Sequence, residues 1–176
     1  MKYFSMLLFS IFFVAFSNAQ SNVNQLALTQ SVAAQANQMA SLYKGGDYKG
    51  YVKFVHPTIV KDAGGESKMV ELLNKQNEQI KNKGILINSI VFNPPSEIVK
   101  NKNELQCTIS QHTELKPAKG RVITYTTLIA ISIDNGKSWK FIDTSNKDIK
   151  EVRTVFPNLS DKITLPPKQK PSVYMM

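Results

Sequence analysis

The chain is poor in cysteine, in arginine and in motifs that hold metals or nucleotides. Cys107 is the only cysteine, so packing alone must stabilise the fold. The sequence has no HxH, HExxH or CxxC spacing that would indicate zinc. It also has no GxGxxG or P-loop to cradle phosphate, and no Gly-x-Ser-x-Gly nucleophile elbow. We therefore expect no metal and no cofactor.

The single cysteine could still be a nucleophile if a neighbouring positive charge lowered the pKa of its thiol. Cys107, however, alternates in phase with Leu105 and Ile109 in a segment with strand character. That phase predicts a side chain that faces the core, where cysteine behaves as a small apolar residue.

Long apolar runs are also rare, and the one that stands out is at the N-terminus. Lys2 precedes the apolar run 7–16, and Ser17-Asn18-Ala19 follows it. A bilayer span needs roughly 20 apolar residues, which this run does not reach. The pattern predicts a secretory signal peptide over 1–19, cleaved after Ala19. We expect an exported protein, periplasmic or secreted, that is not transmembrane after cleavage.

Positive charge is in excess but is carried almost entirely by lysine. The 22 Lys and Arg side chains outnumber 13 Asp and Glu, and only two are arginine. An excess of this size favours anionic surfaces such as lipid headgroups or envelope polymers. The lysines are scattered, so a solubilising surface is the simpler interpretation. Arginine forks and clustered aromatics, which nucleic-acid binding proteins use, are missing, and we expect no nucleic-acid partner.

Three helices are predicted in the first half of the mature chain. Apolar residues recur at spacings of three and four over 22–44, 48–55 and 66–83. Gly45-Gly46 ends the first helix. Pro57 ends the second, because the residue before a proline leaves the helical region. Residues 58–60 are predicted to be extended.

From Ile85 onward the apolar period changes to two, which predicts strands. The strands expected are 85–92, 97–99, 104–115, 121–133 and 138–142. Asp134-Asn135-Gly136 is a strong hairpin signal. A short helix or turn over 148–156 follows. Residues 157–176 are proline-rich, and we expect a tail that packs on the surface or is disordered.

Helices followed by an antiparallel meander predict one α+β domain over 20–156. Its three helices should cover one face of a curved, cone-like sheet, because long strands twist. A cavity should then lie between the first helix, the third helix and the inner face of the sheet. The order of elements over 26–143 resembles the nuclear-transport-factor-2-like superfamily. Segments 64–69, 103–108, 132–139 and 156–160 are similar to a family of exported, uncharacterised Bacteroidetes proteins. The resemblance implies a cone and an exported location, and no catalytic residue is carried over from it.

Few side chains qualify for acid–base chemistry. His56 is expected at the end of the second helix, where the helix dipole would stabilise the imidazolium. Asp62, Tyr43 and Tyr51 are candidates to lie near it. A pocket of this kind would suit catalysis by His56 and Asp62. The plainer interpretation is that His56 only caps a helix before Pro57.

Two further candidates for ligand binding lie on the long strands. Tyr125 shares its phase with Ile123, Thr127 and Ile129, which would place its hydroxyl in the cavity or the core. His112 lies on a polar strand face, which is usually solvated.

The sequence leaves three functions open. The first is a binding protein that holds a small apolar or amphipathic ligand in the cone. The second is a cofactor-free isomerase, lyase or hydrolase with a His/Asp/Tyr pocket. The third is a module that docks on an anionic envelope polymer or lipid surface, or that forms a homodimer through its open sheet.

Overall fold

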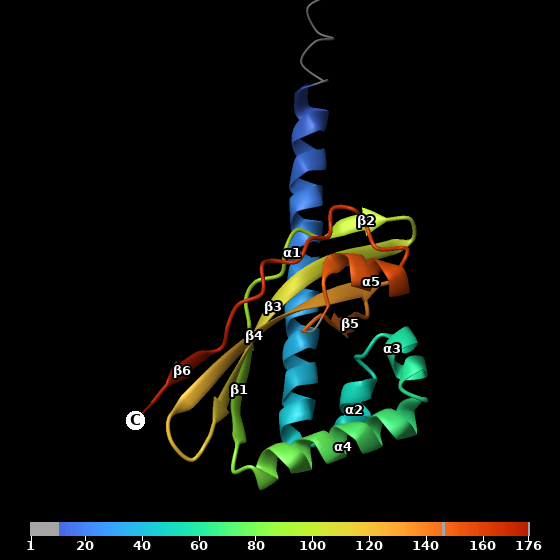
Figure 1. The fold of residues 1–176 in the computed structure, drawn as a ribbon. Helices are drawn as coiled ribbons and strands as arrows, with labels where there is room; N and C mark the ends of the chain where they lie inside the picture. The colour runs from blue at the N-terminus through green and yellow to red at the C-terminus, as the bar shows by residue number, and fades with distance from the viewer. Residues whose placement is uncertain (1–10, 146, 176) are drawn as a thin grey trace, which may run out of the picture.

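The structure is a computed structural model that describes residues 11–145 and 147–175, with side chains from residue 24 onward. Its first helix, α1 (Ile11–Gly45), is 35 residues long and begins well before the start predicted at residue 22. The predicted signal peptide lies partly outside the described residues, and no side chain of residues 1–19 is described. Figure 1 shows the last part of α1 running along the sheet, and α4 crosses near the C-terminal end of α1.

Three short or medium helices follow α1: α2 (Tyr48–Val52), α3 (Pro57–Asp62) and α4 (Glu66–Asn82). The prediction of an extended segment over 58–60 is therefore wrong, and four described helices, not three, precede the sheet. α3 forms because the ring of His56 caps it and Pro57 occupies its first turn, where no backbone N–H is needed. Nδ1 of His56 accepts the Thr58 N–H at 3.2 Å.

The strands form one open antiparallel sheet, which confirms the predicted α+β class. They are β1 (Leu86–Phe92), β2 (Val99–Asn101), β3 (Glu104–Lys116), β4 (Arg121–Ser132), β5 (Lys140–Asp143) and β6 (Ser172–Tyr174). The main order is β1-β3-β4-β5. β2 pairs with β3 at Glu104–Gln106, and β6 pairs with β4 at Arg121–Ile123. β6 lies within the segment predicted to be a tail.

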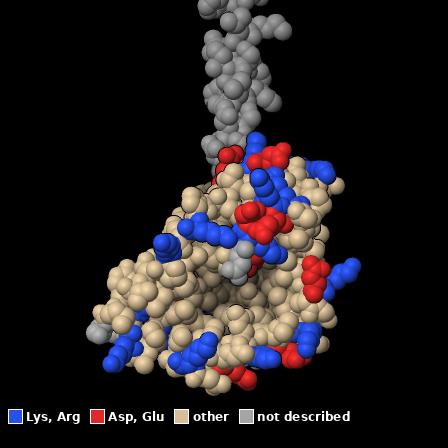
Figure 2. Space-filling view, in the orientation of Figure 1, with Lys and Arg blue, Asp and Glu red and all other residues tan. Residues whose placement is uncertain are grey.

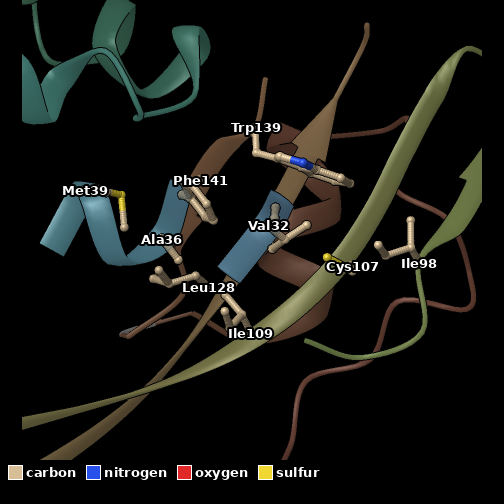
Figure 3. Close-up of a cluster of buried hydrophobic side chains, with 10 residues drawn as sticks. Val32, Ala36, Met39, Ile98, Cys107, Ile109, Leu128, Trp139 and Phe141 are labelled. Carbon is tan, nitrogen blue, oxygen red and sulfur yellow. The ribbon is translucent and has the colours of Figure 1, made fainter. Parts of the chain in front are cut away.

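The inner face of the sheet forms the core with α1 (Figure 3). Cys107 and Ile109 of β3 and Leu128 of β4 project toward Val32 and Ala36 of α1. Trp139, only 1% exposed, closes one end of this cluster. Cys107 is completely buried, as its phase predicted, and burial raises the pKa of its thiol to about 12.

A second core lies on the outer face of the same sheet. Ile129 and Ile131 of β4 are covered by α5 (Ile149–Val155) and by the chain that follows it. Leu159 and Ile163 from this C-terminal segment are buried in the second core. Both faces of the C-terminal part of β4 are therefore apolar.

The connection between β4 and β5 is fixed to α1. Asn135 and Gly136 have positive φ, which turns the chain as the hairpin signal predicted. Ser31 Oγ donates to the carbonyl of Gly136 at 2.9 Å, and Gln35 accepts the N–H of Trp139 at 2.9 Å. These contacts hold the turn against the helix.

The outer edge of β5 is covered by the segment between α2 and α3. The N–H of Phe141 donates to the carbonyl of Phe54 at 2.7 Å, and the N–H of His56 donates to the carbonyl of Phe141 at 3.0 Å. Val55 and Phe141 thereby form a short parallel bridge. The outer edge of β5 is therefore paired at Phe141.

Over the described residues, none of the helices combines the length and apolar character needed to cross a membrane.

Candidate functional site

A cavity of about 550 Å³ lies between the helices and the inner face of the sheet. It is placed as the sequence predicted, beside α1 and α4 and against β1, β3 and β4. Figure 2 shows the surface hollowed between the α4 side of the molecule and the α5 side. A cavity of this volume is in the range of small-molecule binding sites.

Helix α4 provides an apolar wall that meets no core. The helix is 17 residues long and none of its side chains is buried. It packs on α2 and, less closely, on α3. Its apolar face, formed by Met69, Leu73 and Ile80, lines the cavity instead. The apolar face of an amphipathic helix normally packs on a core, whereas this one borders a cavity.

The sheet wall of the cavity is more polar than the helix wall. Gln111 and Thr113 of β3 and Thr124 and Thr126 of β4 line it. These residues pair across the two strands, Gln111 with Thr126 and Thr113 with Thr124. The cavity is thus amphipathic, with apolar helices on one side and hydroxyl and amide groups on the other.

Tyr43 and Tyr51 lie together in the cavity wall. Their ring centroids are 5.1 Å apart and tilted by 55°. Burial raises the pKa of Tyr51 strongly, and the charge of Asp143 adds to the effect. Burial also raises the pKa of Tyr43, with smaller contributions from Tyr48 and Asp143. Both phenols are therefore neutral at physiological pH and can donate a hydrogen bond to a ligand.

Asp143 lies at the rim of the cavity, at the end of β5. Its Oδ1 accepts the N–H of Ser145 at 2.7 Å and the hydroxyl of Thr126 at 3.3 Å, and it also contacts the hydroxyl of Ser145. No described residue donates to Oδ2. Only one oxygen of this carboxylate, Oδ1, is therefore hydrogen-bonded to described residues.

A second pocket, of about 410 Å³, lies on the outer face of the sheet beneath the C-terminal segment. His112 and Tyr125 are cross-strand partners that both line it, and their rings meet edge to face at 5.0 Å. The hydroxyl of Tyr125 bonds Ser172 of β6 at 2.9 Å. Tyr125 also reaches the wall of the inner cavity, whereas His112 does not.

His56 and Asp62, the predicted catalytic pair, do not line either of these cavities. His56 precedes a helix N-terminus and accepts a hydrogen bond there, so the prediction of a stabilised imidazolium is wrong. Burial, the largest cause, lowers the pKa of His56. Its ring lies edge to face on Phe156 at 4.9 Å. Asp62 is exposed at the end of α3.

Several residues of the two cavities were not predicted from the sequence, among them Thr126, Asp143 and Lys147. The register of β4 with β3 and β5 places Thr126 and Asp143, and that register cannot be read from one segment alone. The polar residues at 111–113 and 124–126 were the available signal.

Charges and metal ligands show no other concentrated site. Among the residues whose side chains are described, no three His, Cys, Asp or Glu side chains group as a metal site would require. Figure 2 shows basic side chains spread over the viewed face with acidic ones between them. This face presents no continuous basic patch.

A scan against protein-family models finds none that matches the chain, and no curated protein matches it either.

Proposed function

We propose that the protein is exported and binds a small apolar or amphipathic ligand in the cavity of its cone. The observation that carries the proposal is the apolar face of α4, which lines the cavity and belongs to neither buried core cluster. Apolar surface left without protein partners loses both burial and dispersion contacts. A ligand chain in the cavity would restore both.

The polar sheet wall and the two neutral tyrosines favour a ligand with a polar end. Tyr43, Tyr51 and the threonines of β3 and β4 supply donors and acceptors on one side only. The few polar groups of a binding pocket orient the ligand, while its apolar wall provides most of the affinity. The curved sheet and its helices also support placing the chain in the nuclear-transport-factor-2-like superfamily.

Binding fits the geometry better than catalysis by His56 and Asp62. An acid–base pair must reach a common substrate, and these two side chains do not share the cavity. Docking on an anionic envelope surface has only the net charge of +9 in its favour. The export part of the proposal is supported by the N-terminal pattern and is tested by N-terminal sequencing of the protein recovered from its host.

Ligand binding is tested with the neutral fluorescent probe N-phenyl-1-naphthylamine. We expect saturable binding to the wild-type protein and at least about tenfold weaker binding to Leu73→Trp, which fills the cavity. Leu72→Trp is the matched control, because Leu72 is the next residue of α4 and is 46% exposed. Circular dichroism confirms that both variants are folded.

Native mass spectrometry of protein purified without denaturant should also show a retained ligand. Equal probe binding by the wild-type protein and folded Leu73→Trp would refute binding in this cavity. A wild-type protein that takes up no apolar probe at any concentration would do the same.

A further inference from the structure

The inner cavity and the outer pocket meet at a gap in the edge of the sheet. β5 pairs with β4 at Leu128–Ile131, and β6 pairs with it at Arg121–Ile123. Between them, residues 124–127 of β4 have β3 on one side and, among the described strands, none on the other. At the end of this stretch the carbonyl of Thr127 accepts hydrogen bonds from the N–H and the hydroxyl of Thr144.

The residues at the gap belong to both cavities. Tyr125, Thr126, Ser145 and Lys147 line the inner cavity and also the outer pocket. The hydroxyls of Thr126 and Ser145 bond each other at 2.9 Å across the gap. The inner cavity and the outer pocket are therefore adjacent here, with polar groups between them.

The outer pocket differs from the inner cavity in its chemistry. Its walls carry Ser110, His112 and Thr127, and two lysines, Lys147 and Lys168. Two ion pairs are found among the described side chains, Lys68 with Glu71 and Arg153 with Asp161, so neither pocket lysine is paired. Asp148 also lines the pocket, so these three charged side chains together leave it with one net positive charge.

Two carboxylates lie near the gap, and each accepts hydrogen bonds through its Oδ1. Oδ1 of Asp148 caps α5 by accepting the N–H groups of Lys150 and Glu151 at 2.8 and 2.9 Å. Oδ1 of Asp143, which lines the inner cavity, accepts hydrogen bonds from Ser145 and Thr126. Lys147 lines both cavities and Lys168 only the outer pocket, so the outer pocket is the more positive of the two.

We infer that the ligand is a single-chain amphiphile with an anionic head group, a carboxylate or a phosphate. Its chain lies in the inner cavity against α4, and its head passes the gap to Lys147 and Lys168 in the outer pocket. Charge-assisted hydrogen bonds from lysine favour such a head over a neutral or cationic one. This inference rests on the proposed function and adds the class of ligand and its orientation.

The test compares four ligands that share one chain: decanoate, decyl phosphate, decanol and decyltrimethylammonium. Their affinities are measured by displacement of N-phenyl-1-naphthylamine. Decanoate or decyl phosphate should bind about tenfold more tightly than decanol, and the ammonium more weakly still. The two anions distinguish a fatty-acid head from a phosphate head.

The lysines are tested in pairs that change the net charge equally. Lys147→Gln with Lys168→Gln should abolish the preference for the anion over decanol, read as the ratio of the two affinities, because Lys147 also lines the inner cavity. Lys150→Gln with Lys170→Gln is the control, because both lysines are exposed and neither lines a cavity. The control pair should keep the preference.

The orientation of the ligand is read by photo-crosslinking. A diazirine beside the carboxylate should label peptides containing 145–148 or 165–169, and one at the far end of the chain should label α4 or β1. Labelling of the inner cavity by both probes would refute passage through the gap.

The outcomes separate this inference from the proposed function. Equal binding of decanol and decanoate, with both blocked by Leu73→Trp, would refute the anionic head and leave cavity binding intact. An equal loss in both lysine pairs would refute recognition by Lys147 and Lys168. Failure of all four amphiphiles to bind would overturn both the inference and the proposed function.

Discussion

The two ends of the space between α1 and the sheet are built from the same elements and have opposite contents. At the closed end, Cys107 and Leu128 of the sheet pack on Val32 of α1, and Trp139 seals the cluster. At the open end, β3 and β4 continue with Thr113 and Thr124, and a cavity lies between them and the α1 residues that line it, such as Tyr43. The cavity therefore depends on which side chains the inner face of the sheet carries: apolar ones at the closed end and threonines at the open end.

The largest expected effect is a difference in unfolding free energy between substitutions at the closed end and at the open end. Trp139→Ala should lower the free energy of unfolding by about 3–5 kcal/mol, because it leaves a cavity in a packed core. Leu73→Ala should lower it by only ~1 kcal/mol, since that side chain faces space that is already open. Urea unfolding of the ligand-free proteins measures both. Similar losses would show that the open end is as well packed as the closed one.

A smaller effect compares two glycines with positive φ, one near each end. Gly136 (φ 85) faces Leu28, and an added Cβ would lie 2.1 Å from Cδ2 of that leucine. Gly84 (φ 69) joins α4 to β1, and an added Cβ would meet nothing within 4 Å. Gly136→Ala should cost about 2 kcal/mol and Gly84→Ala about 1 kcal/mol, because both are strained and only the first displaces a packed neighbour. Thermal unfolding measures the loss of stability in both variants. A larger loss in Gly84→Ala than in Gly136→Ala would contradict a packed turn at the closed end.

The smallest effect concerns pH and a residue that belongs to neither cavity. Burial lowers the pKa of His56 below 6.5, so the unfolded chain binds a proton first as the pH falls. Stability should therefore decrease from pH 7 to pH 5 and level off below the pKa of the folded state. His56→Asn, which keeps an acceptor at the helix cap, should reduce this decrease.

The measurement for His56 is the free energy of unfolding at pH 7 and pH 5 in both proteins. Binding of N-phenyl-1-naphthylamine to the folded protein should not differ between them, because His56 lies outside the cavity. An identical decrease in both proteins would show that other groups carry the acid sensitivity.

Much of the architecture was predictable because it is local. The 3.6-residue period predicted α4 within one residue at its C-terminal end, and the phase of Cys107 predicted its burial. α3 was missed because its β-branched residues suggest a strand, while the signals that start it are the cap and the proline just before them. The prediction followed the β-branched composition of 58–60 and not the helix-start signals at His56 and Pro57.

The site was predictable in place but not in detail. Leu128 and Ile129 are both buried, on opposite faces of β4, so alternation could not say which face meets α1. Tyr125 shares the phase of Ile129, and only the register shows that this phase is the outer one. The gap at residues 124–127 depends on where β5 ends and β6 begins, and β6 was hidden in a proline-rich segment.

The bridge between Val55 and Phe141 bears on how one molecule meets another. An unpaired strand edge invites a strand from a second copy and leads to aggregation. The backbone groups of Phe141 are already bonded to Phe54 and His56, so a foreign strand cannot pair with β5 at this residue. The segment between α2 and α3 thus protects the middle of this edge from a second copy.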